Sequence, residues 1–83
     1  MTRLTLPLLT IYSRPGCHLC ELLLEELQPL IRGRAELEVL NIELQPEWLE
    51  KYATRIPVVE LDDRVLCQYH LDADAIAGAL DGA

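Results

Sequence analysis

The sequence is poor in aromatic residues and has no long apolar run. Its 83 residues include no phenylalanine, and the aromatic side chains are one tryptophan and three tyrosines. Hydrophobic residues still make up 51% of the chain, so we predict a compact core built mainly from aliphatic side chains. No apolar run approaches the roughly 18 residues that cross a bilayer, and the first residues lack the features of a secretory signal. We therefore expect a cytoplasmic protein that does not enter the membrane.

Basic residues are also few. Seven lysines and arginines stand against fourteen acidic residues, which gives a net charge of −7, and the arginines are dispersed along the chain. A surface of this kind repels the phosphate backbone of DNA and RNA. We therefore expect no nucleic-acid partner.

Only three cysteines are present, too few for the disulfide framework of a small secreted domain. Two of them, Cys17 and Cys20, are separated by two residues and follow Gly16. In a helix, Cα atoms at this spacing lie roughly 5 Å apart, and a disulfide needs about 4.4–6.8 Å. The pair can therefore open and close as a dithiol with little movement of the backbone. In a reducing compartment such a pair is more often catalytic or metal-binding than structural.

Hydrophobic periodicity predicts a regular alternation of strands and helices. Pro29 lacks a backbone donor, so we expect it to kink the first helix or to end it near Gln28. Asp62 and Asp63 are typical of a hairpin turn, and Asp72 is typical of a helix N-cap. The expected elements are strand 8–12, helix 17–31, strand 36–42, helix 45–52, strand 58–61, strand 64–67 and a last helix from 72 to about 82.

The order of elements is therefore β-α-β-α-β-β-α. A helix that joins two parallel strands crosses in the right-handed sense, and the last two strands are joined as a hairpin. We predict an α/β fold with a four-stranded mixed sheet and helices on both of its faces. No repeat or linker divides the chain, so residues 1–83 are expected to form a single domain.

Two segments resemble glutaredoxin, of the thioredoxin-like superfamily. They are Tyr12-Ser13-Arg14-Pro15-Gly16-Cys17-His18-Leu19-Cys20 and Arg55-Ile56-Pro57-Val58. The resemblance implies a thioredoxin-like (glutaredoxin-like) fold in which Cys17 is the nucleophile and Cys20 resolves the mixed disulfide. It also implies that Pro57 is cis and faces the dithiol, and that the backbone of Ile56 pairs with a bound peptide or glutathione. Arg14 would hold the glutathione carboxylate or the thiolate.

The sequence also departs from the glutaredoxin pattern. His18-Leu19 stands where typical glutaredoxins have Pro-Tyr, and Cys67-Gln68-Tyr69-His70 stands where they have Gly-Gly-x-Asp. Cys67 is then either a small buried hydrophobe or a third redox partner. Gln68 and His70 either line the substrate groove or belong to the loop surface. We therefore expect a glutaredoxin-like protein, with glutathione as an open alternative for the co-substrate.

These patterns predict a small monomeric thiol–disulfide oxidoreductase that reduces protein disulfides or glutathione mixed disulfides. We expect no bound cofactor and no metal. Two alternatives stay open. One is a noncatalytic redox-sensing or protein-binding module. The other is a metal carrier. His18, Cys67 and His70 would complete a zinc site begun by the two cysteines, or two copies of the protein would share an iron–sulfur cluster.

Overall fold

The structure is a computed structural model that describes residues 6–81. Its sheet has four strands in the order β2-β1-β3-β4, with β1 and β2 parallel and the other neighbours antiparallel. The predicted α/β topology is therefore confirmed. The elements are β1 (Leu8–Ser13), α1 (His18–Ile31), β2 (Glu36–Asn41), the 3₁₀ turn η1 (Ile42–Leu44), α2 (Pro46–Tyr52), β3 (Val58–Leu61), β4 (Arg64–Gln68) and α3 (Ala73–Asp81).

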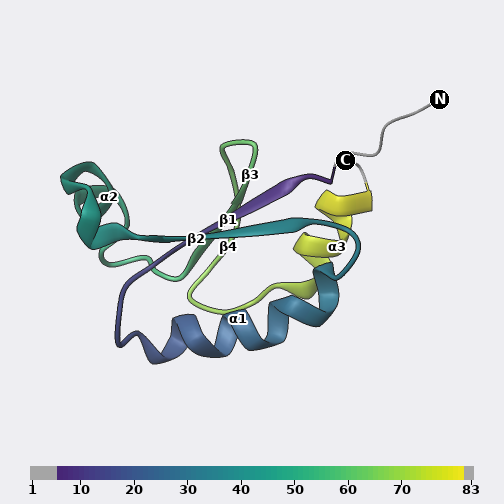
Figure 1. Ribbon diagram of the computed structural model, residues 1–83, viewed down its shortest axis with the longest axis horizontal. Helices are drawn as coiled ribbons and strands as arrows, with labels where there is room; N and C mark the ends of the chain where they lie inside the picture. Colours follow the sequence, from purple (N-terminus) through teal and green to yellow (C-terminus); the bar gives the residue numbers. More distant parts are fainter. Residues whose placement is uncertain (1–5, 82–83) are drawn as a thin grey trace.

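The two faces of the sheet are covered by different helices, because successive side chains of a strand point to opposite sides. Leu9 and Ile11 of β1 lie in the main hydrophobic core together with buried residues of α1 and α3. Val58 of β3 lies in a second, smaller cluster with Tyr52 of α2. Figure 1 shows α1 and α3 together on one side of the sheet and α2 at the end far from α3. Helices therefore occupy both faces, as predicted.

Helix α1 runs through Pro29 and ends at Ile31, which agrees with the expected range 17–31 and excludes the alternative of an end near Gln28. Pro29 removes the hydrogen bond that would reach back to Glu25. Both residues are exposed, so water can satisfy the free carbonyl group. Ile31 is only 4% exposed and belongs to the main core, and its burial stabilises the last turn. Among residues 6–81, no helix has both the length and the apolar character needed to span a membrane.

Three boundaries depend on local backbone chemistry. The β3–β4 turn has positive φ at both Asp62 (51°) and Asp63 (64°), the combination that a two-residue hairpin of type I′ requires. The strand expected at 36–42 ends one residue earlier, at Asn41, whose side chain accepts a hydrogen bond from Glu43 N at 2.9 Å and caps η1. Asp72 caps α3 as predicted, since its Oδ1 accepts from Ala75 N at 3.0 Å. The expected helix end near Gly82 lies outside the described residues.

Most of the aromatic side chains gather where α2 covers the sheet. The rings of Tyr12 and Tyr52 are stacked with centroids 4.0 Å apart, and Trp48 meets Tyr12 edge-on at 5.8 Å. The Tyr52 hydroxyl donates to Glu60 Oε2 at 2.6 Å. Glu60 is 8% exposed, so this hydrogen bond satisfies part of a carboxylate that folding removes from water.

This cluster predicts a loss of stability in alkali. Burial, the adjacent Tyr52 hydroxyl and the charge of Glu60 raise the pKa of Tyr12 from 10.0 to about 12. A raised pKa means that folding favours the neutral phenol. The stabilisation that the neutral Tyr12 phenol contributes to the fold is therefore complete below pH 10 and is lost as the pH rises from 10 to about 12. We expect Tyr12→Phe, which cannot ionise, to lose less stability than the wild type over this interval. Urea unfolding midpoints of both proteins at several pH values in this interval measure the difference. Equal losses in the two proteins would contradict the assignment of the effect to Tyr12.

Candidate active site

The two cysteines of the motif follow a tight turn after β1. Pro15 and Gly16 are the central residues of this turn, and Cys17 N donates to Arg14 O at 3.3 Å. Gly16 has φ of 78°, which glycine adopts without strain, and Pro before Gly at these positions is typical of a type II turn. The turn therefore reverses the chain and places Cys17 at the start of α1.

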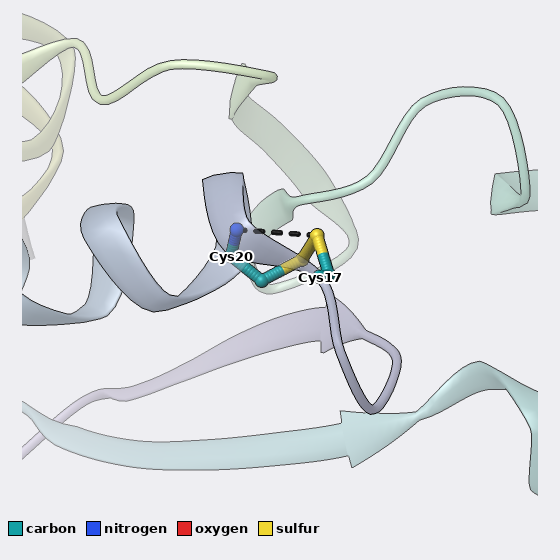
Figure 2. Close-up of a disulfide and its surroundings, with 2 residues drawn as sticks. All are labelled: Cys17 and Cys20. Atoms are coloured by element: carbon teal, nitrogen blue, oxygen red, sulfur yellow. Dashed lines mark hydrogen bonds between the residues drawn. A yellow bond between two sulfur atoms is a disulfide. The ribbon is translucent and has the colours of Figure 1, made fainter.

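Cys17 and Cys20 are disulfide-bonded, with Cα atoms 5.2 Å apart, and Figure 2 shows the bond at the first turn of α1. Cys17 is the N-cap residue and is partly exposed. Cys20 lies one turn further along and is only 2% exposed. The two sulfur atoms therefore differ in access to water, and an incoming disulfide can reach Cys17 much more easily than Cys20.

The helix start supplies hydrogen-bond donors to the Cys17 sulfur. Cys20 N donates to Cys17 Sγ at 3.2 Å (dashed in Figure 2). When the disulfide opens, the same N–H and the positive end of the helix dipole favour a thiolate at Cys17. Glu21 adds a negative charge in the first turn, but it is exposed, so water and salt screen its opposing effect.

Arg14 lies in the turn and is exposed. Its guanidinium forms an ion pair with Glu43, with 3.0 Å between Nη2 and Oε2. That contact joins the turn to η1 and occupies one of the donors through which Arg14 would hold a carboxylate or the thiolate.

The segment before β3 carries the predicted proline. The Ile56–Pro57 peptide bond is cis, as the resemblance implies. The Ile56 N–H donates to Tyr52 O at 3.1 Å, so it is already satisfied within the protein. Pro57 O accepts from Tyr69 N at 2.9 Å, which ties this segment to the residue that follows β4.

The remaining candidate residues lie at and just after the end of β4 and differ in burial. Cys67 is 8% exposed and belongs to the main core, and burial raises the pKa of its thiol. It is therefore a poor nucleophile at neutral pH. Gln68 is exposed, and its Oε1 accepts from Arg55 Nε at 2.6 Å. His70 is also exposed. Among residues 6–81, no group of three or more His, Cys, Asp or Glu side chains is close enough to hold a metal ion.

Tyr69 and two leucines of α1 line a hollow near the end of β4. The sequence pattern did not indicate them as site residues. Tyr69 has φ of 67°, unusual for a residue with a bulky side chain, and its hydroxyl donates to Thr54 O at 2.8 Å. Leu19 and Leu22 are 39% and 42% exposed. The leucine spacing of α1 alone could not identify these two, because it does not show which face the sheet covers. The one available signal for Tyr69 was its place where glutaredoxins have the Gly-Gly-x-Asp segment.

Comparison with known proteins agrees with this geometry. The family model for the glutaredoxin-like domain (DUF836) matches residues 8–81, which include the dithiol, the cis-proline and the end of β4. The chain belongs to the glutaredoxin-like family. Its fold is therefore the thioredoxin-like fold that the resemblance implies.

Solved structures of similar chains support the same fold. The NMR structure of protein Ne2328 from Nitrosomonas europaea has 37% sequence identity and a TM-score of 0.81, and the alignment covers 95% of this chain and 98% of that one. The X-ray structure of XcR50 from X. campestris has 31% identity and a TM-score of 0.67, with coverage of 90% and 97%. A malarial protein with 14% identity and a TM-score of 0.63, covering 94% of this chain and 96% of that one, shares the fold alone.

Proposed function

We propose that this protein is a thiol–disulfide oxidoreductase that reduces protein disulfides or glutathione mixed disulfides. The observation that carries the proposal is the asymmetric pair, in which Cys17 caps α1 and is partly exposed while Cys20 is 2% exposed and within bonding distance. Reduction of a disulfide needs one thiolate that the substrate can reach and a second thiolate that can then release the bound substrate. The glutaredoxin-like family membership adds support.

The reaction begins with the reduced dithiol. The Cys17 thiolate attacks one sulfur of the substrate R–S–S–R′, forms the mixed disulfide Cys17–S–S–R and expels R′S⁻, which takes a proton. The Cys20 thiolate then attacks Cys17 Sγ, closes the Cys17–Cys20 bond and releases RS⁻, which is also protonated. Two electrons pass from the protein to the substrate, and two glutathione molecules, or one protein dithiol, return the protein to its reduced form and are themselves oxidised to a disulfide. The 5.2 Å between the Cα atoms lets this ring close without unwinding the helix.

The other site residues have supporting roles in this proposal. The side chains of Arg14, Gln68 and His70 and the carbonyl group of Ile56 would contact the substrate, and cis-Pro57 would shape the surface beside the dithiol. Cys67 would act only if a fluctuation exposed it. We place the reaction in the cytoplasm, where the glutathione and thioredoxin systems keep thiols reduced, and propose that the protein acts as a monomer.

Two measurements test the proposal together. Mass spectrometry of the protein equilibrated with a series of glutathione redox ratios is expected to show the Cys17–Cys20 bond opening and closing, with any glutathione adduct at Cys17 and none at Cys67. An insulin-reduction assay with an excess of dithiol is expected to show repeated turnover. Cycling without turnover would reject the enzyme and favour a redox-dependent binding module. A pair that never opens would reject both.

A further inference from the structure

A small, mainly apolar hollow lies between α1 and the segment that follows β4. It has a volume of about 140 Å³ and is lined by Leu19, Leu22, Leu23, Glu26, Tyr69, His70 and Leu71. Leu19 stands between the two cysteines in the sequence. One wall of the hollow therefore belongs to the same turn of α1 as the dithiol.

Most of the side chains that line this hollow are apolar, and three of them stay partly exposed. Leu19, Leu22 and Tyr69 are 39%, 42% and 45% exposed, while Leu23 at the base is 1% exposed. An apolar cavity of roughly 150 Å³ holds one benzene-sized group. The hollow is thus matched in size and chemistry to one aliphatic or aromatic side chain, and too small for a whole tripeptide.

Tyr69 holds one wall of the hollow in place. Its N–H donates to Pro57 O at 2.9 Å and its hydroxyl donates to Thr54 O at 2.8 Å, so both ends of the residue are tied to the segment that carries the cis-proline. A wall fixed in this way keeps its shape when the hollow is empty, which lowers the entropy lost on binding.

The charges around the hollow favour a basic group next to the apolar side chain that would fill it. A second, shallower depression of about 500 Å³ shares His70 and Leu71 with the hollow and includes Asp72 and Asp74 in its lining. Glu26 lines the hollow itself. Among the described residues that line the two depressions there is no lysine or arginine; Arg55 lies alongside with its Nε hydrogen-bonded to Gln68. Three carboxylates on a protein of net charge −7 attract cations and repel anions.

We infer that the substrate class is a protein segment in which the reacting cysteine has an apolar neighbour, seated in the hollow, and a lysine or arginine beyond it, facing Asp72 and Asp74. This inference rests on the function proposed above and narrows it. Glutathione itself fits this surface poorly, because it has no apolar side chain and its two carboxylates give it a net negative charge.

The test uses reduced protein and a set of substrates whose cysteine is blocked with the same thionitrobenzoate group. Attack by Cys17 on the cysteine sulfur releases the coloured thiol, so single-turnover mixing gives a rate constant for each substrate. The first peptide has Leu next to Cys and Lys beyond it. The second has Ser for Leu, the third has Glu for Lys, and the others are blocked glutathione and blocked mercaptoethanol.

We expect the Leu–Lys peptide to react about tenfold faster than each of the other peptides and than glutathione, a difference of about 1.4 kcal/mol for one apolar or one charged contact. Raising the salt concentration should reduce the advantage of Lys over Glu but not that of Leu over Ser. Leu22→Gln should remove the preference for Leu. Leu30→Gln should preserve it, because Leu30 is on the same helix and is 37% exposed, against 42% for Leu22, but does not line the hollow.

The failures of this inference and of the proposed function are distinguishable. If blocked mercaptoethanol reacts but the three peptides and glutathione react at equal rates, the oxidoreductase stands and the substrate class is wrong. If the preference survives Leu22→Gln, the hollow does not bind the leucine. If the protein releases no coloured thiol even from blocked mercaptoethanol, the proposed function fails and the inference fails with it.

Discussion

Replacing Cys17 with serine is expected to abolish disulfide reduction. A serine hydroxyl stays protonated at neutral pH and does not attack a disulfide, and the two remaining thiols, Cys20 and Cys67, are only 2% and 8% exposed. The loss of an essential nucleophile should lower the rate by at least about a thousandfold. Insulin reduction by Cys17→Ser, compared with the wild type at equal protein concentration, measures this loss.

The companion variant Cys20→Ser separates the two roles. Cys17 remains able to attack, so the first half of the reaction should proceed and stop at a mixed disulfide between Cys17 and the substrate. Mass spectrometry should detect this adduct with Cys20→Ser and not with Cys17→Ser. Urea unfolding of both variants against the reduced wild type checks that each is folded. If Cys17→Ser kept its activity, or if the trapped adduct were on Cys67, the assignment of the nucleophile would be wrong.

The largest effect on stability is expected from Leu27→Ala. Leu27 is fully buried, with 0% exposure, at the centre of the apolar face of α1. Removing its side chain loses the transfer free energy of the missing groups and leaves a cavity, so we expect a loss of about 3 kcal/mol. A domain of this length has a total of roughly 4–12 kcal/mol, so the variant should be near the limit of folding. Urea titration of the oxidised protein gives the value.

Leu30→Ala is the matched control on the same helix. Leu30 is 37% exposed, and its truncation removes little buried area, so the free energy of unfolding should fall by less than about 1 kcal/mol. Both variants exchange leucine for a residue of equal or better helix propensity, so the difference between them reports burial alone. Equal losses at the two positions would show that α1 does not pack on the sheet in the described orientation.

Most of the fold follows from local features of the chain. The apolar strand segments, the helical spacing of the leucines and the Asp62–Asp63 hairpin turn each depend on neighbouring residues, and together they give the order of elements that the structure confirms. The dithiol could also be predicted from the sequence, because two residues three positions apart on a helix lie close together regardless of how the helix packs. The choice between the two outcomes expected at Pro29 has a tertiary cause, since burial of Ile31 in the main core outweighs the hydrogen bond that the proline removes and the helix continues.

Spacing along the chain was enough to predict the strands and the three α-helices, the family resemblance and the cysteine pair. The packing of the elements alone shows which leucines of α1 are buried and which line the hollow between α1 and the segment after β4, and it brings Tyr69 against Thr54 and Tyr52 against Glu60. Those contacts join residues 8 and 15 positions apart in the chain, in helices, strands and the loops between them. They exist because the strands and helices pack in one particular arrangement, and no pattern of neighbouring residues specifies that arrangement.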